Sequence, residues 1–280
     1  MARRKMQKQK KRWLVYLLLL VFVAVVWLNA RQTFAAKEPP APPFETVQLP
    51  EHTYDWIRLS TDEKGRKRYT HADGIAAEVA IDISSHQGEI DWQAVAADGV
   101  NNVFLRVGSR GYETGEVYGD ERFAENLQGA QAAGLSCGVY FYSQAVTMEE
   151  AQAEADFVLE AIKGYELRLP VVMDYEEVLK PTSRTLNLDN QTRTDNAIAF
   201  CERIRKAGFS AMLYSTRSML LNHFALNRLA DYPLWVADYN DTTAFPYLFA
   251  VWQYTDRGRV AGIGPDVDLN LIFVDLKTSA

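Results

Sequence analysis

An apolar run that ends in three carboxylates is the part of this sequence best suited to chemistry. The run VVMDYEE covers residues 171–177 and places Asp174, Glu176 and Glu177 within four positions. Burying a carboxylate is costly unless it is paired or its ionisation is put to use. Either a strand runs out into solvent here, or the carboxylates are delivered for a reaction.

The spacing of these acids separates them into two sets. Side chains alternate along a strand, so Asp174 and Glu176 share one face with Val172. Glu177 faces the other way with Tyr175. Residues two apart on a strand have Cβ atoms about 6.5–7 Å apart, a separation that suits an acid and a charged partner around one glycosidic bond.

That separation leaves the stereochemistry of such a reaction open. Carboxyl groups about 5–5.5 Å apart are typical of retaining glycosidases, and those about 6.5–9.5 Å apart are typical of inverting ones. Mutual repulsion and partial burial are expected to keep one of the pair protonated near neutral pH, as a general acid requires.

Further polar and aromatic residues lie in the runs that read as strands, toward their ends. In a parallel barrel, functional residues collect at the carboxyl ends of the strands. Aromatic rings stack on pyranose rings, so carboxylates surrounded by Tyr and Trp are typical of a sugar site. For any single residue, nearness to solvent explains the pattern equally well, but it explains the whole set poorly. The set consists of Asp82, Arg106, Tyr140, Tyr142, Asp174, Glu176, Tyr214, Trp235, Asp238, Trp252 and Gln253.

Strands that alternate with helices must position these residues. Eight short apolar runs predict strands at 79–84, 103–108, 137–143, 170–176, 211–215, 234–239, 250–254 and 268–273. Helical patterns at 121–134, 147–164 and 192–208 each close on a glycine. This alternation predicts parallel βα units and an α/β, TIM-like (β/α) barrel. Residues 240–249 are too few for a full helix, so we expect an irregular barrel with reduced late helices.

The amino-terminal segment has a different character. Residues 1–12 hold seven Lys or Arg and no acid, which predicts a cytoplasmic segment. The following residues are uncharged and apolar up to position 28, with Trp13 and Trp27 at the two ends. We predict one transmembrane signal-anchor at 13–30 that places the rest of the chain on the extracytoplasmic side of the cytoplasmic membrane. Cleavage near residues 33–35 is the alternative.

The remaining chain divides into a linker and one large domain. Residues 31–76 begin as a Pro-rich spacer, and the Lys64-Gly65 pair predicts a turn with a small hairpin. Residues 77–280 form the predicted catalytic domain. Cys137 and Cys201 favour two buried free thiols, with a single disulfide as the alternative.

Charge and motif content exclude several classes of function. The chain has a formal charge of −6 and its first twelve residues carry +7, so the remainder carries −13. A body this acidic argues against a nucleic-acid partner. The four histidines lack metal-ligand spacing, and no nucleotide-binding fingerprint is present. We therefore expect no metal, no cofactor and a monomer.

The sequence resembles glycoside hydrolase family 25, the N-acetylmuramidase (lysozyme) family. Five family-like motifs occur in order over about 200 residues. They are GIAAEVAIDISSHQGEIDW (74–92), FAENLQGAQAAGLSCGVYFYSQA (123–145), VVMDYEE (171–177), PLWVADYN (233–240) and WQYTDRGRVAGIGPDVDLN (252–270). The resemblance implies a flattened α/β barrel with incomplete helices.

The resemblance also implies an activity and the residues that perform it. The expected reaction is hydrolysis of the β-1,4 bond between N-acetylmuramic acid and N-acetylglucosamine in peptidoglycan. Glu176 would be the general acid, and Asp174 would stabilise positive charge or orient the 2-acetamido group. Asp82 and Asp268 match the two further acids of the family's cleft.

Two alternatives to a membrane-tethered muramidase remain. A non-catalytic module that binds cell-wall glycan through the same cleft is one, and a hydrolase of another polymer, such as a chitin-like one, is the other. The four acids favour an enzyme, because a binding module has no need of a raised-pKa acid beside a second carboxylate. The predicted anchor is a departure from the freely secreted and phage-borne members of the family.

Overall fold

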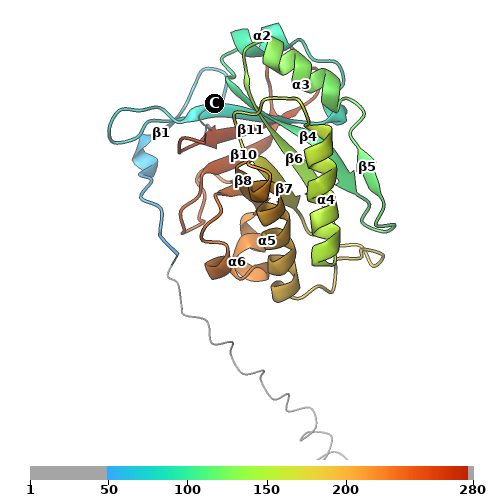
Figure 1. The fold of residues 1–280 in the computed structure, drawn as a ribbon. Helices are drawn as coiled ribbons and strands as arrows, with labels where there is room; N and C mark the ends of the chain where they lie inside the picture. Colours follow the sequence, from blue (N-terminus) through green and yellow to red (C-terminus); the bar gives the residue numbers. More distant parts are fainter. Residues whose placement is uncertain (1–48, 277–280) are drawn as a thin grey trace, which may run out of the picture. The chain divides into compact units, whose positions relative to one another are not determined.

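Eight strands close into a barrel at the centre of the structure (Figure 1). This computed structural model describes residues 49–276. The barrel strands are β3 (Glu78–Ile83), β4 (Asn102–Arg110), β6 (Ser136–Ser143), β7 (Val171–Tyr175), β8 (Ala211–Thr216), β9 (Leu234–Ala237), β10 (Val251–Gly258) and β11 (Val267–Ile272). Their order is β3-β11-β10-β9-β8-β7-β6-β4, and β3 pairs with β4 to close the ring. All eight predicted strands are confirmed. A further short strand, β5 (Val117–Gly119), pairs with β4 outside the ring and was not expected.

One strand runs against the predicted parallel arrangement. β11 is antiparallel to both of its neighbours, β10 and β3. The eight residues between β10 and β11 contain no helix to carry the chain back across the barrel, so β11 returns as a hairpin partner. The beginning of β11 therefore lies at the rim where the other strands end. Asp268 stands directly opposite Asp82 in the ladder as a result.

Helices cover only part of the barrel. The α-helices are α2 (Trp92–Ala97), α3 (Phe123–Ala132), α4 (Met148–Ala161), α5 (Asn190–Lys206) and α6 (Arg217–His223). The 3₁₀ turns are η1 (Trp56–Arg58), η2 (Ser85–Gln87) and η3 (Leu226–Arg228). The three predicted helices are confirmed as α3, α4 and α5. Residues 238–266, all of which are described, contain no helix, as the short spacing predicted.

The lead-in segment packs against the barrel near β10 and β11. The predicted hairpin is confirmed as β1 (Leu59–Thr61) paired with β2 (Lys67–Tyr69). Tyr54 has its ring centroid 4.9 Å from that of Phe249 and 4.4 Å from that of Phe273. These rings bury apolar surface on a part of the barrel that has no covering helix.

A buried ion pair fastens the hairpin to the barrel. Arg66 is 2% exposed and pairs with the carboxylate of Asp98 at the end of α2. Its guanidinium also donates to the carbonyl oxygens of Asp98 and Arg259, both at 2.9 Å. Residues 49–76 belong to the same compact unit as the barrel.

The two faces of the strands pack into two separate cores. Val172 belongs to the small core inside the barrel, whereas Val171, Met173 and Tyr175 belong to the large core under the helices. This alternation is the one expected from a strand at 170–176. Cys137 and Cys201 are both buried free thiols, which confirms the favoured interpretation.

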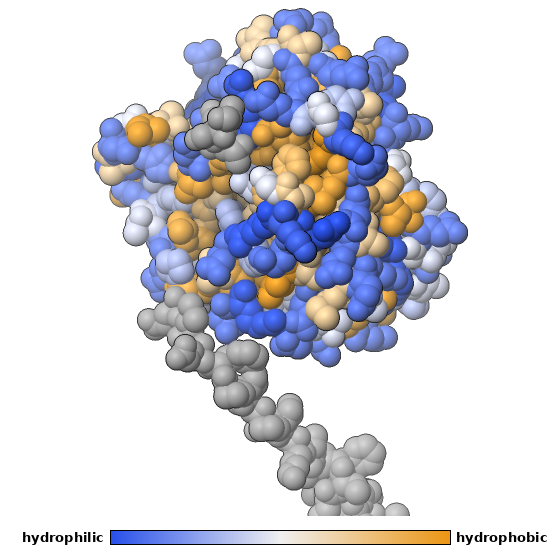
Figure 2. Space-filling view, in the orientation of Figure 1, coloured by the Kyte–Doolittle hydropathy of each residue, from blue (hydrophilic) through white to orange (hydrophobic). Residues whose placement is uncertain are grey.

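One face of the molecule is mostly hydrophilic. In Figure 2, hydrophilic residues cover most of the visible face, and hydrophobic ones show in a hollow near its centre. Among residues 49–276, no helix is both long and apolar enough to cross a membrane. The predicted cytoplasmic segment 1–12 and anchor 13–30 lie outside the described residues.

Candidate active site

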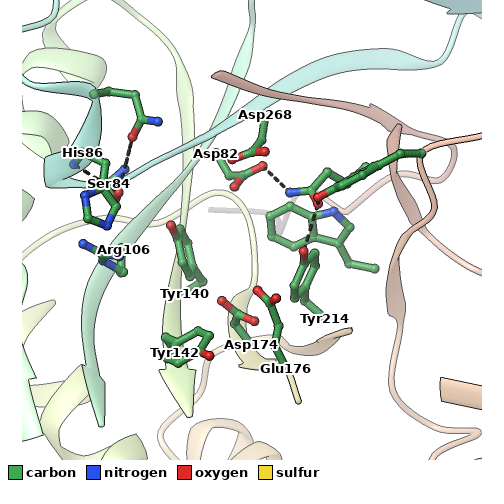
Figure 3. A pocket seen from close by; sticks show the side chains of 14 residues that line it. Asp82, Ser84, His86, Arg106, Tyr140, Tyr142, Asp174, Glu176, Tyr214 and Asp268 are labelled. Carbon is green, nitrogen blue, oxygen red and sulfur yellow. Dashed lines mark hydrogen bonds between the residues drawn. The ribbon is translucent and has the colours of Figure 1, made fainter. Parts of the chain in front are cut away.

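A cavity of about 270 Å³ opens at the rim of the barrel (Figure 3). The four predicted acids line it, together with six of the eight predicted binding residues. The full lining consists of Asp82, Ser84, His86, Gln87, Arg106, Tyr140, Tyr142, Asp174, Glu176, Tyr214, Trp235, Tyr239, Gln253 and Asp268. Carboxylates from three separate strand ends therefore meet in one space walled by tyrosine and tryptophan.

Asp174 and Glu176 form a proton-sharing pair at the end of β7. Asp174 is 5% exposed, and its Oδ1 is buried without a hydrogen-bond partner among the described residues. Burial and then the neighbouring Glu176 and Asp82 charges raise the pKa of Asp174 well above its ordinary value. Burial and the Asp82 charge also raise the pKa of Glu176, which a hydrogen bond from Asp174 partly offsets. Both shifts favour the protonated form, and the two carboxyl groups lie where they can share one proton.

Asp82 and Asp268 form a second pair on the neighbouring strands β3 and β11. Oδ2 of Asp82 accepts hydrogen bonds from Gln253 Nε2 at 3.0 Å and Asn270 Nδ2 at 2.9 Å. Burial raises the pKa of Asp82, and these two donors oppose the rise. Burial, the Asp82 charge and a hydrogen bond to Asp82 raise the pKa of Asp268 to about 9. Asp268 therefore carries a proton at neutral pH, and its O–H donates a hydrogen bond to Asp82.

Aromatic side chains orient the two amides that hold Asp82. The hydroxyls of Tyr214 and Tyr239 donate to Gln253 Oε1 at 2.9 and 2.8 Å. Trp235 Nε1 donates to Asn270 Oδ1 at 2.8 Å. Because both amide oxygens are occupied by donors, both amide nitrogens must turn toward Asp82.

Arg106 supplies a positive charge near the other end of the cavity, beside His86 (Figure 3). It lies within β4 and not at the strand end, next to an irregularity in the pairing with β6. Its guanidinium donates from Nε to the buried carboxylate of Asp120 at 2.8 Å and from Nη2 to Ser85 Oγ at 3.2 Å. The Arg106 charge partly offsets the rise in the pKa of Asp174.

Two predicted binding residues do not lie in the cavity. Asp238 follows β9, and its carboxylate pairs with Arg217 at 2.9 Å and accepts from Thr243 Oγ1 at 3.0 Å. Trp252 is fully buried in the large core under the helices, and its Nε1 donates to the carbonyl oxygen of Asp238 at 2.8 Å. Their neighbours Tyr239 and Gln253 line the cavity, so the alternation of side chains turns Asp238 and Trp252 to the outside.

Several functional residues were missed by the sequence interpretation. Asn270 stands two positions after Asp268 and therefore on the same face of β11, a spacing that could have identified it. Tyr239 follows the strand end and is 52% exposed at the mouth of the cavity. The side chains of Ser84, which caps the η2 turn, and of Gln87 within it also line the cavity. Both lie in the family-like motif at 74–92, but neither was selected as a site residue.

Comparisons with known proteins agree with this geometry. The family model of the glycosyl hydrolases family 25 matches residues 81–263. The uncharacterized protein YegX of Escherichia coli O6:H1 is 31% identical over 198 residues, which is 68% of each chain.

Two solved structures share the fold. The modular autolysin LytC from Streptococcus pneumoniae, in complex with synthetic peptidoglycan ligand, is 25% identical with a TM-score of 0.65, over 77% of this chain and 52% of that one. The bacterial lysozyme from Streptomyces coelicolor is 26% identical with a TM-score of 0.60, over 71% of this chain and 93% of that one. The chain thus spans about half of the autolysin. The family model covers most of the barrel, and the chain belongs to family 25 of the glycosyl hydrolases.

Proposed function

We propose that this protein is a muramidase, which hydrolyses the β-1,4 bond between N-acetylmuramic acid and N-acetylglucosamine in peptidoglycan. The observation that carries this proposal is the convergence of Asp82, Asp174, Glu176 and Asp268 in one cavity walled by aromatic rings. Membership of family 25 supports it, as does the likeness to a lysozyme and to an autolysin that binds a peptidoglycan ligand.

Glu176 is the general acid in this mechanism. The free Oδ1 of Asp174 accepts the N–H of the substrate's 2-acetamido group, which favours the ionised form of Asp174. The proton that the pair shares then resides on Glu176. Glu176 passes it to the glycosidic oxygen as the bond to C1 breaks, and the leaving sugar departs as an alcohol. Water then adds its hydroxyl to C1 and returns its proton to the Glu176 carboxylate, which completes the hydrolysis.

The negative charges of the cavity stabilise the transition state. The sugar acquires positive charge as the glycosidic bond breaks. The ionised Asp174 lies beside this charge and stabilises it directly or through the acetamido group. Because Asp268 keeps its proton, Asp82 and Asp268 together add about one further negative charge on the opposite side of the cavity.

We further propose that residues 13–30 hold the enzyme at the outer face of the cytoplasmic membrane. The sixteen uncharged residues 13–28, with Trp13 and Trp27 at their two ends, support a single span. Seven basic residues before them support a cytoplasmic amino terminus. This arrangement places the domain on the side of the membrane where peptidoglycan lies.

The test is digestion of purified peptidoglycan, with mass spectrometry of the products. A muramidase leaves N-acetylmuramic acid as the new reducing end, and a glucosaminidase leaves N-acetylglucosamine. Glu176→Gln should lower the release of reducing ends by at least about 100-fold, as expected for loss of a general acid. Glu177→Gln is the matched control, because Glu177 does not line the cavity.

Two outcomes contradict the proposal. Wild-type turnover by the Glu176→Gln variant excludes Glu176 as the acid. Retained binding of peptidoglycan without cleavage by the wild-type chain favours the non-catalytic glycan-binding module instead.

A further inference from the structure

The main chain of Glu176 lies one residue beyond the regular ladder of β7. The last parallel pair between β6 and β7 joins Ser143 to Tyr175, and the pairing of β7 with β8 already ends at Asp174. The carbonyl oxygen of Glu176 therefore has no strand partner. Backbone polar groups inside a protein need hydrogen bonds, so another group must complete the pairing here.

The side chain of Gln144 completes it. Gln144 follows the end of β6, is fully buried, and donates from Nε2 to the carbonyl oxygen of Glu176 at 3.1 Å. Its Oε1 accepts from the hydroxyl of Thr185 at 2.9 Å, which fixes the orientation of the amide. On the other side, Ser215 Oγ donates to the carbonyl oxygen of Tyr175 at 2.5 Å. Two side chains thus extend the sheet by one residue, up to the acid.

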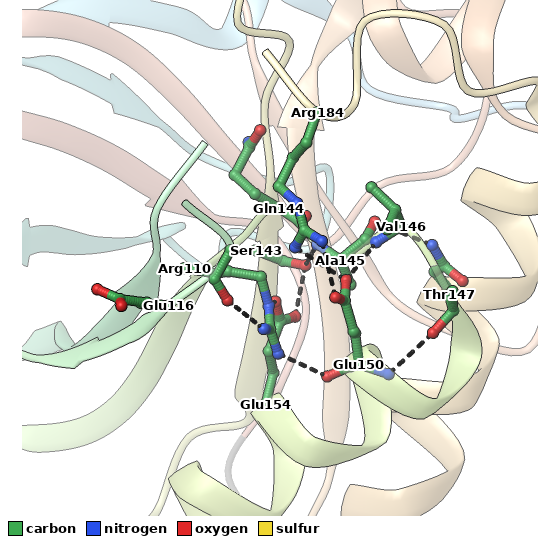
Figure 4. Close-up of polar contacts among 12 residues, drawn as sticks. Arg110, Glu116, Ser143, Gln144, Ala145, Val146, Thr147, Glu150, Glu154 and Arg184 are labelled. Atoms are coloured by element: carbon green, nitrogen blue, oxygen red, sulfur yellow. Dashed lines mark hydrogen bonds and ion pairs between the residues drawn. The ribbon is translucent and has the colours of Figure 1, made fainter. Parts of the chain in front are cut away.

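An ion pair between two rim segments holds Gln144 in turn (Figure 4). Arg184, between β7 and α5, donates to the carbonyl oxygen of Gln144 at 3.3 Å. It also donates to both carboxylate oxygens of Glu150 on α4 at 2.9 and 2.7 Å. The main-chain nitrogen of Val146 donates to the same carboxylate at 2.9 Å. The guanidinium of Arg184 packs against Gly115, where an added Cβ would stand 2.8 Å from Cζ of Arg184.

We propose that Gln144 is a positioning residue for the general acid: it holds the main chain of Glu176 so that the carboxyl meets the glycosidic oxygen. This inference rests on the proposed role of Glu176. Gln144 does not line the cavity, so it acts through Glu176 and not on the substrate. Such support matters because a displacement of about 1 Å can lower a rate by about 100-fold.

The position of Glu176 also sets its protonation. The charged and titratable groups that line the cavity with it are Asp82 of β3, His86 of η2, Arg106 of β4, Tyr140 and Tyr142 of β6, Asp174 of β7, Tyr214 of β8, Tyr239 after β9 and Asp268 of β11. A shift in the main chain of Glu176 changes its distances to these groups. Loss of the Gln144 amide is therefore expected to change the pH dependence of turnover as well as its rate.

The experiment compares the full-length chain with its Gln144→Met variant, in detergent, on soluble glycan strands of peptidoglycan. Methionine keeps the length of the side chain and removes both hydrogen bonds. We expect kcat to fall by about 10- to 100-fold while KM changes by less than about threefold, with a displaced pH profile. Gln128→Met is the control, because Gln128 is exposed on α3 and should keep wild-type kinetics.

A second variant covers the case in which Gln144→Met does not fold. Thr185→Val keeps the shape of the side chain and removes the hydroxyl that donates to the amide oxygen of Gln144, without touching the amide itself. The same change also removes the contacts of this hydroxyl with Ser183 and Tyr175. It should lower kcat in the same direction by about 3- to 10-fold, which corresponds to one weakened hydrogen bond. Wild-type kcat and an unaltered pH profile in the folded variants would overturn the proposal. A lower yield of folded protein with normal kcat per folded molecule would reduce Gln144 to a structural role.

Failure of the proposed function can be told apart from failure of this inference. If the wild-type chain cleaves no peptidoglycan, the proposed function fails. The titration of the Glu176 carboxyl, followed by carbon NMR in the wild type and in Gln144→Met, then still tests the positioning. A changed titration supports it, and an unchanged one rejects it.

Discussion

Replacing Asp268 by Asn is expected to stabilise the fold and to flatten its dependence on pH. Burial and the neighbouring Asp82 raise the pKa of Asp268 to about 9 in the folded protein. In the unfolded chain an aspartate has a pKa of about 3.9. Between these values the folded state binds more protons, so the free energy of unfolding falls as the pH rises from about 4 to about 9. Asn cannot ionise, and its amide N–H can replace the proton donated to Asp82.

The size of the effect follows from the pKa difference. One pKa unit corresponds to about 1.4 kcal/mol, so at pH 7 an isolated Asp268 would have lost about 4 kcal/mol of stability. Asp82 and Asp268 share their proton and titrate as a unit, so the wild type loses only part of this stability. We expect Asp268→Asn to recover about half of it, about 2 kcal/mol. In a domain of this size, that gain raises the midpoint of thermal unfolding by about 4–8 °C.

Thermal unfolding followed by circular dichroism at pH 5, 7 and 9, at constant ionic strength, measures this effect. The difference between Asp268→Asn and the wild type should grow from pH 5 to pH 9. Asp266→Asn is the control, because Asp266 is an exposed carboxylate two residues earlier that pairs with Arg259 on the surface. A difference that stays constant over the three pH values, or a variant less stable than the wild type at pH 9, would refute the reasoning.

Two further predictions concern the lead-in and the amino terminus. Asp98→Ala leaves the buried guanidinium of Arg66 without its partner and should cost about 3–5 kcal/mol in urea unfolding. Glu160→Ala, which breaks an exposed pair with Lys163, should cost less than about 1 kcal/mol, and an equal cost for both variants would contradict the assignment. Deleting residues 13–30 should move the protein from the membrane fraction to the soluble fraction. Extraction of the intact chain from membranes by alkaline carbonate would exclude the anchor.

Local periodicity was enough to predict the eight barrel strands, the three longest helices and the central pair of acids. The alternation of side chains placed Asp174 and Glu176 on one face, and the structure puts both in the cavity. Thr147 is the first residue of the helical pattern at 147–164, and its hydroxyl accepts the N–H of Glu150 at the start of α4. These features depend on neighbours within a few residues, so the sequence contains the information directly.

Choosing residues by their nearness to a strand end was less reliable than choosing them by face. Trp252 and Asp238 were selected for their type and position, although each is adjacent to a residue that lines the cavity. Adjacent residues of a strand face opposite ways, so only one of each pair can reach the site. Asn270 was overlooked for the same reason, because it shares its face with Asp268.

The sequence by itself determined the eight barrel strands, the helices α3, α4 and α5, and which two acids of VVMDYEE lie together. Only the tertiary structure decided that β11 runs antiparallel and brings Asp268 opposite Asp82. It also decided that residues 49–76 pack on the barrel and that the Gln144 amide extends the sheet at Glu176. The physical reason is the distance along the chain over which each interaction acts. Periodicity and capping act within a turn or two of the chain, whereas strand direction, surface coverage and amide orientation depend on groups brought together by the closed barrel.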